Sequence, residues 1–140
     1  LVVMADNARL IELFVRRGIM PDAGAAYLLP RLVGLHRAKE LLFLGDDLSA
    51  TDALRLGIAN RVVPALELRA EVTALADRLA AAPTRALAMT KWLVNRSFES
   101  SRQTAFDEEA LAQELLSGTH DAREGMTAFV ERRPAVFRGW

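Results

Sequence analysis

The apolar residues of this chain follow two successive patterns, which change near residue 64. Residues 1–5 form a continuous apolar run, which is typical of a buried strand. Residues 9–15 alternate weakly, which predicts a second strand, and residues 60–63 predict a brief strand or extended segment. Short helices are predicted over residues 23–29, 35–44 and 53–56, ended by Pro30, Gly45 and Gly57.

Beyond residue 64 the pattern is almost entirely helical. Leu68, Val72, Leu75 and Leu79 recur at the spacing of one face of an amphipathic helix, which is expected to end before Pro83. Three further helices are predicted over residues 84–98, 101–116 and 121–133, the last opened by Asp121 as a capping box. The chain therefore reads as an α/β part followed by a helical region, with too few strands for a self-sufficient sheet.

Composition narrows the possible partners. The chain has 140 residues, of which 51% are hydrophobic, and equal numbers of basic and acidic residues, 18 of each. This balance gives no general basic surplus for nucleic acid or an anionic membrane surface, so a small molecule or another protein is the expected partner. The chain has no cysteine and only His36 and His120 as histidines, so neither a disulfide nor a metal site is expected. No apolar run approaches the length of a membrane span, and a cytoplasmic location is the default expectation.

The most unusual polar residue is Asp22, which lies between Pro21 and a run of small residues in an apolar stretch. One interpretation is that Asp22 caps a helix beginning near Ala23. The other is that the small residues leave room for a ligand and that the carboxylate acts as a base near neutral pH. Taken alone, these residues favour the cap.

Several motifs occur in a fixed order along the chain: GIMPDAGAAYLLPRLVG at residues 18–34, LLFLGDDLSA at 41–50, VVP at 62–64, MTK at 89–91 and EGMTAFVERRP at 124–134. Together they resemble the crotonase superfamily, the enoyl-CoA hydratases and isomerases. The resemblance implies an α/β fold in which residues 1–64 form the second half of a crotonase-like β/α spiral core. It further implies that residues 65–140 form a C-terminal helical trimerisation region.

The same resemblance implies the substrate and the partners. The substrate is expected to be an acyl-CoA thioester of fatty acid metabolism, and no cofactor is expected because coenzyme A enters as part of that substrate. The expected assembly is a homotrimer or a dimer of trimers, completed by a missing N-terminal half of the same subunit. Because the family's oxyanion hole comes from loops upstream of Leu1, the isolated chain is expected to be catalytically poor or inactive.

The resemblance also separates two reactions. Hydratases of this family use two glutamates, of which one would lie before Leu1 and the other aligns with Phe14, which cannot transfer a proton. Glu12 is displaced from that position by two residues and is a weak substitute. Asp22 falls where isomerases of the family, and a related dehalogenase, carry their catalytic carboxylate. The expected reaction is therefore double-bond isomerisation with Asp22 as base; the alternatives are hydration or, for the isolated chain, a non-catalytic oligomerisation or binding fragment.

Two further groups of residues are expected at the site by position in the family. The acyl group is expected to contact large or apolar residues, which have ordinary core packing as their alternative role: Phe14, Met20, Pro21, Tyr27 and Leu28. Phe129 and Arg132 resemble residues that contact coenzyme A from a neighbouring subunit, and Lys91 is a minor candidate for a nucleotide contact. For Arg132 and the adjacent Arg133 the alternative is a solvated helix end, and for Lys91 it is an ordinary surface position.

Overall fold

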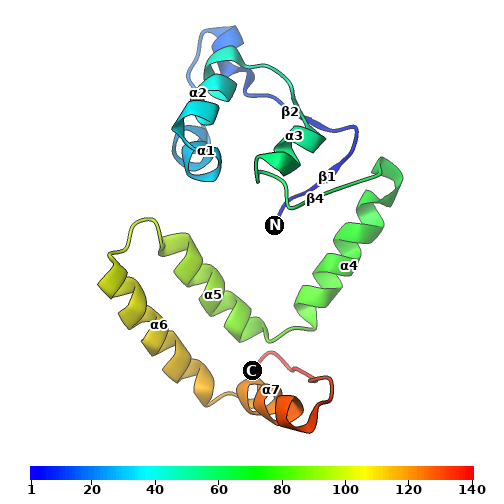
Figure 1. Ribbon diagram of the computed structural model, residues 1–140, viewed down its shortest axis with the longest axis vertical. Helices are drawn as coiled ribbons and strands as arrows, with labels where there is room; N and C mark the ends of the chain where they lie inside the picture. The colour runs from blue at the N-terminus through cyan, green and yellow to red at the C-terminus, as the bar shows by residue number, and fades with distance from the viewer. The chain divides into compact units, whose positions relative to one another are not determined.

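The computed structural model describes residues 1–140, which form two compact units, Leu1–Thr73 and Ala74–Trp140 (Figure 1). The division between the units falls within one helix, α4. The predicted boundary at residue 64, between spiral core and helical region, stays a prediction. In chain order the elements are β1 (Val3–Ala5), β2 (Arg9–Leu10), the 3₁₀ helix η1 (Leu13–Arg17), α1 (Ala25–Val33), α2 (Leu35–Leu44), β3 (Leu48–Ser49), α3 (Ala50–Arg55), β4 (Arg61–Val63), the 3₁₀ helix η2 (Ala65–Glu67), α4 (Leu68–Ala80), α5 (Thr84–Arg96), α6 (Arg102–Ser117) and α7 (His120–Glu131).

Unit 1 is organised by two short strand pairs. β1 pairs in parallel with β4, with Met4 opposite Val62, and β2 pairs antiparallel with β3. The strands predicted at residues 1–5 and 60–63 are therefore present. α3 packs against them through small side chains, since Ala50 and Ala53 are fully buried together with Met4. This alanine-rich contact lets the helix approach the strands closely and forms the core of the unit.

The strand predicted over residues 9–15 is wrong beyond Leu10. Leu13–Arg17 form η1, which ends at Gly18 in the left-handed conformation (φ 70°). The physical reason is that residues 13–15 are a contiguous apolar run and do not alternate; the helical turn half-buries Leu13 and Phe14 and leaves Val15 exposed. Arg16 of this turn also pairs with Asp46, in the loop after α2, at 3.5 Å. Phe14 therefore lies on a helical turn.

Helix α1 differs from its prediction at both ends. It begins at Ala25, two residues later than expected, and it continues through Pro30 to Val33. Proline lacks the N–H that the carbonyl of Ala26 would accept, which is why a stop was predicted there. Directly after Pro30, the guanidinium of Arg31 donates to the carbonyl of Tyr27, at 2.9 Å.

The prediction for α2 is confirmed, and α3 is present but begins at Ala50, three residues earlier than predicted, and ends at Arg55. α2 ends at Gly45, which adopts φ 64°, and a Cβ at this position would lie 3.0 Å from the carbonyl oxygen of Glu12. Glycine is therefore required both by the backbone conformation and by the close approach of η1. α3 is capped by Ser49, whose hydroxyl accepts the N–H of Asp52 at 3.1 Å.

Unit 2 consists of helices with little enclosed core. α5 and α6 run as consecutive antiparallel helices in Figure 1, and Arg96 of α5 donates to Glu108 of α6 at 2.8 and 3.3 Å. The buried hydrophobic residues of this unit are Ala112 and Ala128. The helices predicted after residue 64 are all present, but their apolar faces are largely exposed, including Phe106 and Leu115. No helix in the structure is long and apolar enough to cross a membrane.

Asp121 does not cap α7, so the predicted capping box is wrong. The cap is Thr119, whose hydroxyl accepts the N–H of Ala122 at 3.1 Å. Asp121 instead lies in the first turn, 5% exposed, and its carboxylate accepts the backbone N–H groups of Arg138 and Gly139, both at 2.8 Å. The carboxylate of Asp121 is used by these two N–H groups, which lie 17 and 18 residues along the chain, and not by the N–H groups of its own helix. Hydrogen bonds from N–H groups stabilise a buried carboxylate.

The last residues of the chain fold back along α7 and are held by its acidic residues. We call Asp121, Glu124, Arg133 and residues 136–140 the C-terminal clasp. Glu124 accepts the N–H of Val136 at 2.8 Å, and the N–H of Asp121 donates to the carbonyl of Trp140 at 3.1 Å. The rings of His120 and Trp140 lie 5.3 Å apart, so His120 is half-buried against the clasp.

Candidate active site

Asp22 lies in the loop between η1 and α1, with its side chain exposed to solvent. The cap of α1 is Gly24, and α1 has no side-chain capping bond. Asp22 contributes only its backbone, since its carbonyl accepts the N–H of Ala25 at 2.9 Å. The interpretation of Asp22 as a helix cap is therefore wrong, because the carboxylate makes no hydrogen bond or ion pair. The carboxylate is available to a ligand.

The two residues after Asp22 hold the loop in an unusual conformation. Ala23 and Gly24 both have positive φ, 49° and 82°. For alanine this left-handed conformation is strained, because its Cβ approaches the following carbonyl. Strain of this kind is characteristic of functional loops, and here it lies next to the candidate base.

Replacement of Ala23 by glycine is expected to raise the free energy of unfolding by about 0.5–1 kcal/mol, because glycine adopts the left-handed conformation without the steric cost. Urea unfolding of the full-length protein would measure the change. The matched control is Ala26→Gly within α1, where glycine is expected to destabilise by about 1 kcal/mol. If both substitutions destabilise equally, Ala23 is not strained.

The residues expected to contact the acyl group surround this loop on two elements. Met20 and Pro21 precede Asp22 directly; Met20 is 77% exposed and Pro21 is half-buried. Tyr27 and Leu28 lie in the first turn of α1, and the N–H groups of both donate to the carbonyl of Gly24. The loop and the first turn of α1 thus form one local surface around Asp22. Phe14 lies half-buried on η1, and its carbonyl accepts the N–H of Ile19 at 3.2 Å.

Glu12 is the second carboxylate to be considered in unit 1. Its side chain lines a small cavity of about 160 Å³ whose other walls are mainly apolar, formed by Leu10, Ile11, Leu29, Leu41, Leu48 and Ile58 together with Asp46. Glu12 is half-buried and precedes η1, whereas Asp22 follows η1 in an open loop. Glu12 is thus half-buried beside this cavity, while Asp22 is exposed to solvent.

The residues expected to contact coenzyme A lie on unit 2. Phe129 is 83% exposed on α7, and Lys91 is exposed on α5. Arg132 ends α7 in the left-handed conformation, with φ 55°, and its side chain makes no hydrogen bond or ion pair. The backbone N–H of Arg132 donates to the carbonyl of Phe129 at 3.3 Å, so the exposed ring and the unpaired guanidinium belong to the same helical turn.

The structure distinguishes Arg132 from its neighbour. Arg133 donates both Nη atoms to Glu124, at 2.6 and 2.9 Å, and its Nε to Glu131 at 2.6 Å. The Arg133 guanidinium, with the N–H of Val136, lowers the pKa of Glu124 to about 2, and the pairing raises the pKa of Arg133. Arg133 is therefore occupied within the clasp, and Arg132 is the arginine that remains available to an anionic ligand.

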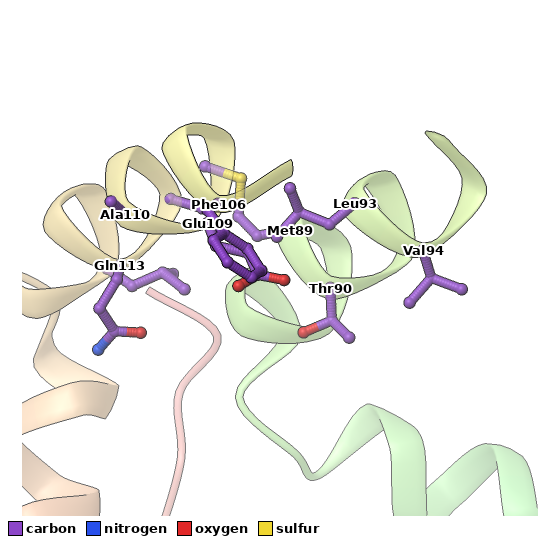
Figure 2. Close-up of a pocket in the computed structure, with 10 residues that line it drawn as sticks. Met89, Thr90, Leu93, Val94, Phe106, Glu109, Ala110 and Gln113 are labelled. Carbon is purple, nitrogen blue, oxygen red and sulfur yellow. The ribbon is translucent and has the colours of Figure 1, made fainter. Parts of the chain in front are cut away.

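A groove with a volume of about 570 Å³ lies between α5 and α6 (Figure 2). Figure 2 shows Met89 and Leu93 of α5 beside Phe106 and Ala110 of α6. Thr90, Glu109 and Gln113 are the polar residues of its lining. None of the residues predicted for the active site lines this groove. The structure contains no cluster of three or more side chains that could hold a metal ion.

One residue beside the site was missed by the sequence analysis. The guanidinium carbon of Arg31 lies 3.5 Å from the centroid of the Tyr27 ring. The spacing of four residues along a helix could have revealed this pair, since residues four apart lie on the same face.

Comparison with known proteins gives a consistent result. Residues 1–139 match the family model described as enoyl-CoA hydratase/isomerase. A crotonyl-CoA hydratase from Syntrophomonas wolfei is 38% identical over 96% of this chain and 52% of its own length. A 1,2-epoxyphenylacetyl-CoA isomerase from Escherichia coli K12 is 35% identical over 99% of this chain and 53% of its own.

Solved structures agree with the sequence matches. The crystal structure of an enoyl-CoA hydratase/isomerase from Cupriavidus metallidurans CH34 superposes with a TM-score of 0.93 at 39% identity. It is covered over 53% of its length, while all of this chain is matched. The chain thus spans about half the length of the relatives it matches, and its fold is the α/β fold of those structures, as predicted.

Proposed function

The chain belongs to the enoyl-CoA hydratase/isomerase family, and we propose that it carries the catalytic carboxylate of an enoyl-CoA isomerase, with Asp22 as the base. The observation that supports this role most directly is that the Asp22 carboxylate has no structural partner. An aspartate that caps a helix or forms an ion pair stabilises the fold, and Asp22 does neither. An exposed, unpaired carboxylate beside a strained backbone is available for proton transfer.

A single carboxylate is sufficient for the proposed reaction. Asp22 removes a proton from C2 of a 3-enoyl thioester, and the electron pair moves into the thioester carbonyl. The carboxylic acid then returns the proton to C4, and the double bond moves to C2–C3. The developing enolate oxygen needs hydrogen-bond donors, typically worth about 3–4 kcal/mol each. We propose that these donors belong to the part of the relatives' length that this chain does not span.

Coenzyme A recognition is proposed for the last turn of α7. Arg132 has a guanidinium without a partner, which suits a phosphate because its N–H groups donate in pairs. Phe129 offers an exposed ring in the same turn for the adenine or the pantetheine chain. Lys91 is a secondary candidate on α5. Arg133 has no such role, because the clasp occupies it.

Hydration is the second candidate reaction, because the relative from Syntrophomonas wolfei is named a crotonyl-CoA hydratase. Hydration requires a second acid–base group, and Phe14 cannot serve. Assay of the full-length protein with 3-enoyl-CoA and 2-enoyl-CoA thioesters separates the two reactions. Isomerisation without hydration supports the proposal, and hydration that exceeds isomerisation contradicts it.

Assembly is a separate proposal for unit 2. Its helices expose large apolar side chains, among them Leu111, Leu115 and Met126, over a unit whose buried hydrophobic residues are alanines. Many exposed large apolar side chains on a unit with so little buried core favour association with another protein surface. The full-length protein is expected to sediment as a trimer or a dimer of trimers. A stable monomer at micromolar concentration would exclude this assembly.

A further inference from the structure

Arg31 and Tyr27 form a side-chain pair on α1. The guanidinium carbon of Arg31 lies 3.5 Å above the Tyr27 ring, and Nη1 donates to the carbonyl of the same tyrosine at 2.9 Å. A cation on the face of an aromatic ring is attracted by the negative potential of that face. The hydrogen bond and the ring contact fix the guanidinium at two points, so each limits the movement of the other.

Pro30 lies directly before Arg31 in α1 and lacks the N–H that the carbonyl of Ala26 would accept. A proline inside a helix removes one N–H donor and pushes on the turn before it, so that carbonyls of that turn lose their normal environment. Arg31 brings a second donor to this turn through its side chain. Lysine could supply the charge but lacks the planar fork that stacks on the ring and donates at the same time.

This pair lies in direct continuity with the loop of the candidate base. Tyr27 is in the first turn of α1, and its N–H donates to the carbonyl of Gly24 at 2.9 Å. Gly24 is two residues from Asp22, and the intervening Ala23 is held at φ 49°. Tyr27 is 41% exposed, so the contact with Arg31 does not bury the residue.

We propose that Arg31 is a positioning residue, which fixes the orientation of the Tyr27 ring and thereby sets how long or bulky acyl groups are received beside Asp22. The proposal rests on the acyl-CoA function inferred above. A ring that is already ordered loses less conformational freedom when a ligand packs on it, so binding is stronger. Short acyl groups that do not reach the ring should be insensitive to Arg31.

The test measures binding of saturated acyl-CoA thioesters, which cannot react, to the full-length protein by calorimetry. Arg31→Met is expected to raise the Kd of a long-chain acyl-CoA by about three- to tenfold and to leave that of a short-chain one within about twofold. Arg37→Met, which removes an exposed arginine paired with Glu40 on α2, is the matched control and should change neither.

A double-mutant cycle and a spectroscopic measurement separate positioning from a general effect on the helix. Tyr27 is the single tyrosine of the chain, so its ring resonances are identified by Tyr27→Phe. Arg31→Met should shift these resonances, and in a Tyr27→Ala background it should no longer alter long-chain binding. Arg31→Lys should behave like Arg31→Met in both measurements, because it lacks the fork.

Each outcome is decisive. Unchanged ring resonances, or an Arg31→Met effect that persists without Tyr27, would overturn the positioning role while leaving the isomerase proposal intact. If Arg31→Met weakens long-chain binding but the full-length protein has no isomerase activity, the positioning role is retained and the proposed reaction is overturned. Failure of the full-length protein to bind any acyl-CoA would overturn both.

Discussion

Asp22→Asn is expected to lower the rate of 3-enoyl-CoA isomerisation by the full-length protein about 10²–10⁴-fold, the range in which a positioned acid–base group contributes. Asparagine has nearly the same shape as aspartate but cannot accept the proton from C2. Because the Asp22 side chain makes no hydrogen bond or ion pair, its loss removes no structural contact. The measurement is kcat and KM with a 3-enoyl-CoA, together with a thermal unfolding curve.

The unfolding curve shows whether a loss of activity in Asp22→Asn comes from a loss of folding. Asp22→Asn should leave Tm within about 2 °C of the parent, since an exposed residue without partners contributes little to stability. Asp77→Asn, on an exposed position of α4, is the control for the loss of one negative charge and should retain full activity. Isomerase activity that survives in Asp22→Asn would assign the proton transfer to another residue.

Asp121→Ala is expected to have the largest effect on stability, lowering Tm by about 5 °C or more. The substitution leaves the N–H groups of Arg138 and Gly139 without the acceptor that each reaches at 2.8 Å. It also releases the tail that packs over α7, where Phe137 lies 3.6 Å from the position of a Cβ on Gly125. These bonds are part-buried and their acceptor is 5% exposed, so their loss costs more than the loss of a bond to a solvated group.

Glu114→Ala is the matched control for Asp121→Ala, because Glu114 is an exposed acidic residue on the neighbouring α6. It is expected to change Tm by less than about 2 °C. Amide hydrogen exchange gives a second measurement. In Asp121→Ala the amides of residues 138 and 139 should lose protection, while those within α6 should keep it. A protected tail in that variant would show that the clasp does not depend on Asp121.

The clasp also makes stability depend on pH in a definite direction. Burial acts to raise the pKa of Asp121, but the N–H groups of Arg138 and Gly139 outweigh it, and the pKa is lowered from 3.8. The pKa of Glu124 is lowered from 4.5 to about 2 by Arg133 and then by Val136. Both carboxylates therefore stabilise the fold fully above their unfolded values, and this contribution is lost as pH falls from about 4.5 towards 2. Glu124→Gln should flatten that part of the stability curve.

The sequence predicted helices better than it predicted caps. The stripe from Leu68 to Leu79 and the stop at Gly45 depend on local spacing and backbone conformation, and both are present in the structure. Asp22 and Asp121 are each followed by residues suited to a helix, which favoured a cap in both cases. Asp121 is occupied by donors 17 and 18 residues away, and such a contact leaves no local signal.

The candidate site was predictable only in part, for related reasons. The place of Asp22 in a loop before a helix follows from Pro21 and the small residues after it. That its carboxylate would have no partner depends on Ala23 and Gly24 adopting positive φ, which moves the start of α1 to Ala25. Alanine rarely adopts this conformation, so its identity argued against the observed loop. Because the helix was predicted to stop at Pro30, the pairing of Arg31 with Tyr27 along one helix face was not predicted.

Because unit 2 has few buried side chains, its stability is expected to depend on association as well as on internal packing. A unit whose buried hydrophobic residues are Ala112 and Ala128 has little internal packing to oppose the entropy of the unfolded chain. If its exposed helices are covered by other copies, folding and association become one equilibrium, governed by mass action. The unfolding midpoint is then a property of a solution at a stated concentration, and variants of this protein are comparable only at equal dilution.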